Sequence, residues 1–244
     1  MKQNQLWISG EIAAAVVIIF VMSYFCRTND SGALKWILAP TAWWAGILGG
    51  IYFEYLPHQG YVNYFHQFLI APSCAGSRFM LLTFLMLVFS FRLSDYNKEN
   101  INVRKEYLWF GFSIVFSYIS TVFVNGIRIV ISVYLPDILD RAHLMDGWLT
   151  PDRLHTLIGT VTYFTSLCVI YLVACWLRGC AEKCGGLPVP VFWYLLVVLA
   201  LPFIKRMYLN EWEGFGQYAV IIVSVCGSIC VLLVVVGRIR RRRN

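Results

Sequence analysis

Long uncharged stretches recur along the chain, separated by short segments that carry the charges. A helix needs about 20 mostly apolar residues to cross the hydrocarbon core of a membrane. The pattern therefore predicts an all-α fold: one polytopic helical bundle over residues 1–244, with about seven to eight membrane helices. The predicted helical segments are Ile12–Phe25, Trp36–Phe53, Phe79–Phe91, Tyr107–Ile127, Thr156–Leu177, Gly185–Ile204 and Phe215–Gly237.

Composition narrows the class of protein further. Of the 244 residues, 59% are hydrophobic and only 14% are charged, and the mean hydropathy is +0.66. Soluble domains carry about 25% charged residues. These values exclude a disordered chain, a coiled coil and an ordinary cytosolic enzyme. The 8 cysteines are scattered, several of them inside apolar stretches, which does not fit a secreted disulfide framework.

The basic residues predict an orientation. Lysine and arginine concentrate in the cytoplasmic loops of membrane proteins, so the tail Arg238–Arg243 is expected in the cytoplasm. Alternating back from that tail places 13 of the 20 basic residues on the cytoplasmic side and the amino terminus outside. The net charge of +7 is thus explained by topology and gives no reason to expect a nucleic-acid partner. The two long segments Glu54–Ser77 and Pro136–His155 then face outward.

Arg128 breaks the membrane pattern. It is the only charge between Tyr107 and Leu135, and it is expected near the outer end of the fourth helix or on a turn just beyond it. Asn125 lies three residues earlier, on the same helical face. Ionisable residues within apolar segments mark functional sites, and the amide beside the guanidinium indicates a polar pocket. The alternative is a snorkelling arginine whose head reaches the lipid headgroups.

Cys74 is the second candidate. Pro72 suits the first position of a helix, which would place Cys74 in the first turn, where free amides and the helix dipole favour a thiolate. Arg78 would follow one turn later on the same face. The alternative is a structural cysteine beside an arginine that marks the membrane boundary. Cys180 and Cys184 are spaced like metal ligands, but without a second pair they are weak evidence for a metal site.

His155 is the third candidate. Thr150, Pro151 and Asp152 are typical of the start of a helix, as cap, first residue and first-turn acid. His155 then projects from the second turn, three residues after Asp152, whose carboxylate is placed to orient the imidazole. The alternative is an interfacial histidine without a role.

A cysteine, an arginine and a histidine at the outer ends of different helices form a recognisable catalytic set. A thiolate attacks a carbonyl, an imidazole moves the proton to the leaving amine, and an arginine stabilises the oxyanion. The G-x-S-x-G elbow of serine hydrolases and the H-E-x-x-H motif of zinc peptidases are absent from the sequence. The predicted chemistry therefore needs no metal and no cofactor.

Three motifs resemble those of the exosortase/archaeosortase family. Cys74-Ala-Gly is similar to the family's C-S-G cysteine motif, Asn125-Gly-Ile-Arg128-Ile to its N-x-x-R-[IV] motif, and His155-Thr-Leu-Ile-Gly to its histidine motif. The order Cys, Arg, His is also that of the family. Ala75 departs from the serine that is common there. The chain looks most like the bacterial exosortase K branch.

The resemblance implies a cysteine protease and transpeptidase in the bacterial cytoplasmic (inner) membrane, with its active site facing outward. Cys74 would be the nucleophile, Arg128 the oxyanion stabiliser and His155 the general acid and base, with Asn125, Arg78 and Asp152 in support. Substrates would be membrane proteins of the PEP-CTERM type, which end in a short motif, a transmembrane helix and basic residues. Water, or an amine of a lipid or glycan, would resolve the thioester.

Two rival functions remain open at this point. A small polytopic transporter would use Arg128 to bind an anionic substrate and would not need Cys74. A structural or assembly protein of an envelope complex would need none of the three residues.

Overall fold

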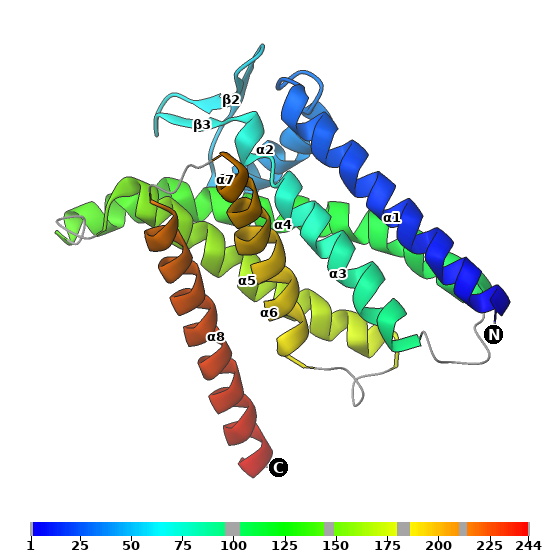
Figure 1. Cartoon of the computed structure of the whole chain (residues 1–244). Helices are drawn as coiled ribbons and strands as arrows, with labels where there is room; N and C mark the ends of the chain where they lie inside the picture. Colours follow the sequence, from blue (N-terminus) through cyan, green and yellow to red (C-terminus); the bar gives the residue numbers. More distant parts are fainter. Residues whose placement is uncertain (1, 96–102, 144–148, 180–185, 210–213, 244) are drawn as a thin grey trace. The chain divides into compact units, whose positions relative to one another are not determined.

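The computed structural model describes residues 2–95, 103–143, 149–179, 186–209 and 214–243. Contacts within the chain group it into two units, residues 1–133 and 134–244 (Figure 1). Helices dominate both units, as the all-α prediction requires.

The elements of the first unit are α1 (Lys2–Thr28), α2 (Lys35–Gly49), β1 (Glu54–Leu56), β2 (Gly60–Asn63), β3 (Phe68–Ile70), the 3₁₀ turn η1 (Pro72–Cys74), α3 (Ser77–Asp95) and most of α4 (Val103–Arg141).

Four helical stretches among the described residues are long and apolar enough to cross a membrane: Pro72–Phe91, Arg104–Arg141, Pro151–Leu177 and Phe215–Val235. Two further apolar helical stretches, Ile12–Thr28 and Pro188–Ile204, are shorter. A membrane-associated helical protein is therefore confirmed, and the predicted number of seven to eight spans is not. The division of the predicted single domain, 1–244, into two contact units leaves its domain status a prediction.

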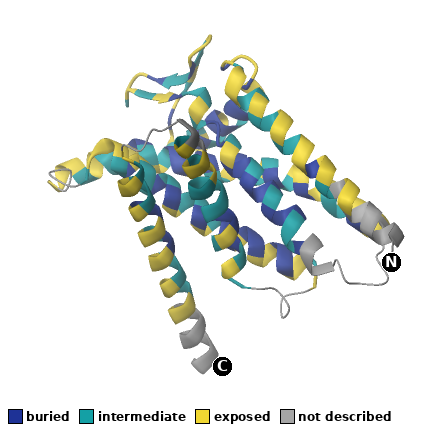
Figure 2. Ribbon diagram, in the orientation of Figure 1, coloured by how far each residue is buried: buried dark blue, intermediate teal, exposed yellow. Residues whose placement is uncertain are grey.

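Large apolar side chains are exposed along several helices, as expected of surfaces that face lipid. Phe20 on α1, Leu108 on α4 and Val220 on α8 (Phe215–Arg243) are all more than 60% exposed. Figure 2 shows exposed positions recurring along α1 and α8.

The helices α1 and α3 run antiparallel. The side chains of Cys26, at the end of α1, and Ser77, at the start of α3, are hydrogen-bonded. Ala15, half-way along α1, packs with Phe84 and Val88 further along α3. The beginning of α1 and the end of α3 therefore lie at the same end of the helix pair (Figure 1).

The prediction that Trp36–Phe53 crosses the membrane is not confirmed, because this segment is not among the stretches long enough to span. Helix α2 has 15 residues, about 22 Å of helix, and Gly50, with φ +63°, turns the chain back at its end. The chain before α2 touches the sheet after it, because the His58 Nδ1 atom lies 2.7 Å from an Asp30 carboxylate oxygen. The Lys35 ammonium also lies 3.7 Å from the centre of the Tyr55 ring. The two flanks of α2 are thus close together, and the outward amino terminus stays a prediction.

A three-stranded antiparallel sheet occupies the first predicted outward segment. Strand β2 is central, pairing Tyr55 with Tyr61 on one side and Val62 with Leu69 on the other. The side chain of Asn63 donates to the Tyr52 carbonyl oxygen at 2.7 Å and accepts from the His66 amide at 2.6 Å. One buried side chain therefore ties together the chain before β1 and the turn after β2.

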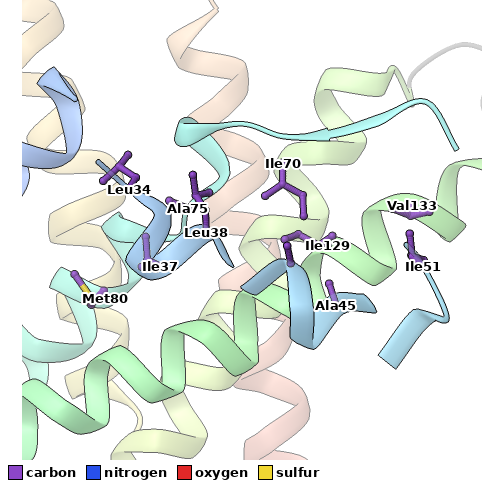
Figure 3. Close-up of a cluster of buried hydrophobic side chains, with 11 residues drawn as sticks. Leu34, Ile37, Leu38, Ala45, Ile51, Ile70, Ala75, Met80, Ile129 and Val133 are labelled. Atoms are coloured by element: carbon purple, nitrogen blue, oxygen red, sulfur yellow. The ribbon is translucent and has the colours of Figure 1, made fainter. Parts of the chain in front are cut away.

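The core of the first unit joins α2, β3, η1, α3 and α4. Its buried members are Leu34, Ile37, Leu38, Ala42, Ala45, Ile51, Ile70, Ala75, Met80, Ile129 and Val133 (Figure 3). Cys74 packs against this cluster as a half-buried neighbour. The candidate nucleophile is thus part of the chain segment that closes the core.

In the second unit, α5 (Pro151–Leu177) packs on α6 (Pro188–Leu195) and α8. The rings of Phe164 and Tyr194 lie 5.3 Å apart, and Arg153 donates to the Gln217 side chain at 3.0 Å. Between α6 and α7 (Leu201–Leu209) the chain is π-helical over Leu196–Ala200. The wider turn precedes Pro202, which has no N–H to donate to the preceding turn.

Candidate functional site

Cys74 closes a single turn of 3₁₀ helix. The Cys74 amide donates to the Ala71 carbonyl at 2.8 Å, and the Ala75 amide to that of Pro72 at 3.2 Å. Pro72 starts this turn, as predicted. Gly76 then takes a positive φ of +74°, and its carbonyl accepts the first helical bonds of α3, from Phe79 and Met80.

Cys74 thus lies in the first turn of the helical stretch Pro72–Phe91, as predicted, but that turn is 3₁₀ and not α-helical. Gly76 interrupts the helical geometry between η1 and α3, because its left-handed backbone fits neither helix. Arg78 is not one helical turn after Cys74 but is an exposed residue at the start of α3. The argument from the helix dipole loses its geometric basis with it.

Asn125 joins the cysteine turn to α4. Its side-chain nitrogen donates to the Cys74 carbonyl oxygen at 2.6 Å, and its side-chain oxygen accepts from Arg128 Nη1 at 3.4 Å. Asn125 is fully buried and Arg128 is 8% exposed. Two of the three motifs singled out in the sequence therefore meet, through residues 51 positions apart in the chain.

Gly76 and Ala75 explain why the cysteine motif needs small residues. A β-carbon on Gly76 would lie 3.1 Å from both Thr121 Cγ2 and Asn125 Cγ on α4. Ala75 is fully buried in the apolar core, where a serine hydroxyl would need a hydrogen-bond partner. The departure from the family's serine thus suits the surroundings of this residue.

Gly126, inside the second motif, lets α2 approach α4. A β-carbon there would lie 2.5 Å from Trp44 Cδ1. The Trp44 indole nitrogen donates to the Phe123 carbonyl at 3.2 Å, and the rings of Trp44 and Phe123 are 4.7 Å apart. Helix α2 therefore supports the segment of α4 that carries Asn125 and Arg128.

Arg128 lies within a helix and not at its end. Helix α4 has 39 residues and continues through Pro136 to Arg141, so part of the second predicted outward segment is helical. The prediction of a helix end or turn near Arg128 is wrong. Its burial also argues against a snorkelling arginine, because the side chain lies inside the first unit.

His155 is on α5, in the second unit. The predicted helix start is confirmed: Thr150 is the cap and accepts from the Arg153 amide at 3.4 Å, Pro151 is first, and Asp152 is in the first turn. His155 and Asp152 are both exposed. The convergence of His155 with Cys74 stays a prediction.

Five described cysteines are free thiols: Cys26, Cys74, Cys168, Cys226 and Cys230. Cys180 and Cys184, the weak metal-ligand pair, lie outside the described residues. Within the ranges that the structure describes, no three His, Cys, Asp or Glu residues gather as a metal site would require. Of these five residues, Cys74 is the one whose backbone carbonyl is bonded by Asn125, the residue that also contacts the buried Arg128.

Comparison with protein-family models, with curated proteins and with solved structures finds no match to this chain. The resemblance to exosortases accordingly rests on the three motifs alone.

Several parts of the site were not predicted from the sequence. Thr121 carries no motif signal, and its contact with Gly76 follows only from the packing of η1 on α4. The sequence does, by contrast, contain a pattern that predicts the sheet. The aromatic and β-branched stretch Tyr61–Phe65 follows the turn-forming Pro57–Gly60, a pattern typical of a hairpin.

Proposed function

We propose that the protein is a membrane cysteine protease and transpeptidase that cleaves carboxyl-terminal sorting signals through a thioester. The observation that carries the proposal is the link from the Cys74 turn through Asn125 to Arg128. Asn125 holds the backbone carbonyl of the turn that carries a free thiol and also contacts a buried guanidinium, so a candidate nucleophile and a fixed positive charge are joined by one hydrogen-bonded side chain.

In the proposed reaction the Cys74 sulfur attacks the carbonyl carbon of the scissile peptide bond. The C–S bond forms, the carbonyl oxygen becomes an oxyanion, and the Arg128 guanidinium stabilises it. Collapse of this intermediate breaks the C–N bond, and the leaving amine takes the proton that His155 removed from the thiol. Water or an amine then attacks the thioester and releases the thiol.

Asn125 is a positioning residue in this scheme. It holds the carbonyl group of Cys74, not its thiol, and therefore fixes the backbone from which the thiol projects. Its contact with Arg128 couples the orientation of the guanidinium to that of the cysteine turn. Arg78, which is exposed on α3, has no part in the proposed chemistry.

The test is processing of a reporter in cells. The reporter is a membrane-anchored protein ending in a Pro-Glu-Pro motif, a transmembrane helix and an arginine tail, and its size is followed by immunoblot. We expect cleavage by the wild type and none by Cys74→Ala. Cys26→Ala is the matched control, since Cys26 is another half-buried free thiol packed against the same core. Equal cleavage by wild type and Cys74→Ala would overturn the proposal.

A buried polar stripe on α4 favours one rival function, the binding and transport of an anion. Its members are Ser113, Ser117, Thr121, Asn125 and Arg128, spaced by three or four residues and all buried. The three hydroxyls already donate to carbonyls of their own helix, which leaves Arg128 as the anion-binding group. Such a transporter would keep its activity in Cys74→Ala and lose it in Arg128→Gln.

A further inference from the structure

Strand β3 is an edge strand that leads directly to the candidate nucleophile. The sheet order is β1-β2-β3, so among the described residues no strand pairs with the outer side of β3. Only Ala71, Pro72 and Ser73 separate its last residue, Ile70, from Cys74.

The backbone groups on that outer side belong to Leu69. The Ile70 carbonyl oxygen is directed at Gly60, since a β-carbon on that glycine would collide with it. Ile70 therefore faces the central strand β2, in register with Tyr61. Consecutive residues of an antiparallel strand direct their N–H and C=O groups to opposite sides, so those of Leu69 point to the outer edge. The Leu69 residue is 41% exposed.

The two edges of the sheet differ in how they are protected. Strand β1 begins with the exposed, charged Glu54 and is followed by Pro57, two devices that discourage the addition of another strand. Strand β3 contains neither a charge nor a proline, and no Lys, Arg, Asp or Glu occurs from Gly60 to Ser77. The sheet therefore blocks pairing on the far side and permits it beside Cys74.

The strand that forms the edge and the turn that carries the thiol pack on the same hydrophobic core. Ile70, at the end of β3, and Ala75, next to Cys74, are both fully buried in the same core cluster (Figure 3). A peptide held by β3 would therefore keep a fixed position relative to Cys74, the condition under which binding contributes to the rate of attack.

We propose that the outer edge of β3 binds an extended segment of the substrate polypeptide as a fourth strand and presents its scissile bond to Cys74. The inference rests on the proposed protease function and adds the mode of substrate binding. One donor and one acceptor, both from Leu69, are available there, so a single substrate residue pairs with the edge. That residue must carry an N–H and is not a proline.

Photocrosslinking in cells tests the contact. A benzoylphenylalanine replaces Leu69 in the Cys74→Ala chain, which is co-expressed with the Pro-Glu-Pro reporter. The matched control carries the same replacement at Glu54, on the protected edge. We expect crosslinks from position 69 to reporter residues next to the motif, and at least tenfold fewer from position 54. Crosslinks from position 69 only to lipid or to a second copy of the chain would overturn the inference, as would equal yields from both positions.

A proline substitution provides a second readout. Leu69→Pro removes only the outward N–H, which edge strands tolerate, whereas Leu69→Ala keeps it. Loss of one hydrogen bond should raise KM for the reporter about tenfold in Leu69→Pro relative to Leu69→Ala, with a smaller change in kcat, because both variants lose the leucine side chain and only the proline also loses the N–H. Identical KM values in both variants would overturn the inference. If the wild type does not cleave the reporter, the proposed function has failed, and the inference fails with it.

Discussion

The side chain of Asn125 donates a hydrogen bond of 2.6 Å to the backbone carbonyl oxygen of Cys74. This bond is the link between α4 and the turn that bears the candidate nucleophile. Because Asn125 is fully buried, its loss would leave that carbonyl without this donor in the interior.

Asn125→Ala should therefore destabilise the first unit. Removing one partner of a buried hydrogen bond lowers the free energy of unfolding by about 1–3 kcal/mol. Thermal unfolding in detergent, together with the rate of maleimide labelling of Cys74, measures the effect, and we expect faster labelling. Asn29→Ala is the control, since the Asn29 side chain donates locally, to the Phe25 carbonyl and the Thr28 hydroxyl at the end of α1. Equal losses of stability in the two variants would contradict the proposed link.

Gly76→Ala should be more harmful than an ordinary glycine substitution. The positive φ of Gly76 is costly for alanine, and the added methyl group would press on Thr121 and Asn125. We expect a loss of more than about 1 kcal/mol in the free energy of unfolding. Gly111→Ala on α4 is the control, because no atom lies within 4 Å of its β-carbon position. The free energy of unfolding of Gly111→Ala should be unchanged or higher, because alanine favours helix over glycine. A larger loss of stability in Gly111→Ala than in Gly76→Ala would refute the role assigned to Gly76.

Arg128→Lys should impair the reaction more than the fold. Lysine keeps the charge but lacks the planar fork, which can contact Asn125 through one nitrogen and still offer other N–H groups to an oxyanion. Removal of an oxyanion stabiliser lowers kcat by about 10²–10³-fold. Reporter cleavage measures the effect of Arg128→Lys on the reaction, and thermal unfolding of the same variant measures its effect on stability. Arg153→Lys, at the α5–α8 contact, serves as the control and should cleave the reporter like the wild type. Similar cleavage by the wild type, Arg128→Lys and Arg153→Lys would exclude Arg128 from the chemistry.

Acid should weaken the contact between the chain before α2 and the sheet. The hydrogen bond from His58, together with the Ala33 amide, lowers the pKa of Asp30 below its usual value near 3.8. A carboxylate whose pKa is lowered by folding stabilises the folded state above its unfolded pKa, and that contribution disappears as the pH falls through the folded value. The difference in Tm between wild type and Asp30→Asn should thus be present at pH 6 and shrink below about pH 4. A difference that is constant with pH would show that the pair contributes nothing.

The long apolar helices were predictable because their signal is local. Periodicity and length are sufficient for α3, α5 and α8, and the Thr150–Pro151 start of α5 was found from capping chemistry alone. The motifs that carry Cys74 and Arg128 were also found from the sequence, and their contact through Asn125 comes from the structure.

What was not predictable depends on tertiary contacts. The segment Trp36–Phe53 is apolar enough for a span, and only the pairing of Asp30 with His58 and of Lys35 with Tyr55 reveals that it turns back. Likewise, the helix through Arg128 was expected to end where charge and Pro136 appear, yet packing of Ile129 and Val133 on the core keeps it helical. The surroundings of a residue, not its own propensity, decided both cases.

The antiparallel packing of α1 on α3 also determines where a label is best placed. The beginning of α1 at Lys2 and the end of α3 at Asp95 lie at one end of this helix pair, and the Cys74 turn lies at the other. The beginning of α1 is therefore the end that is remote from the thiol. A fluorescent protein or purification handle attached there would stay clear of anything that approaches the thiol.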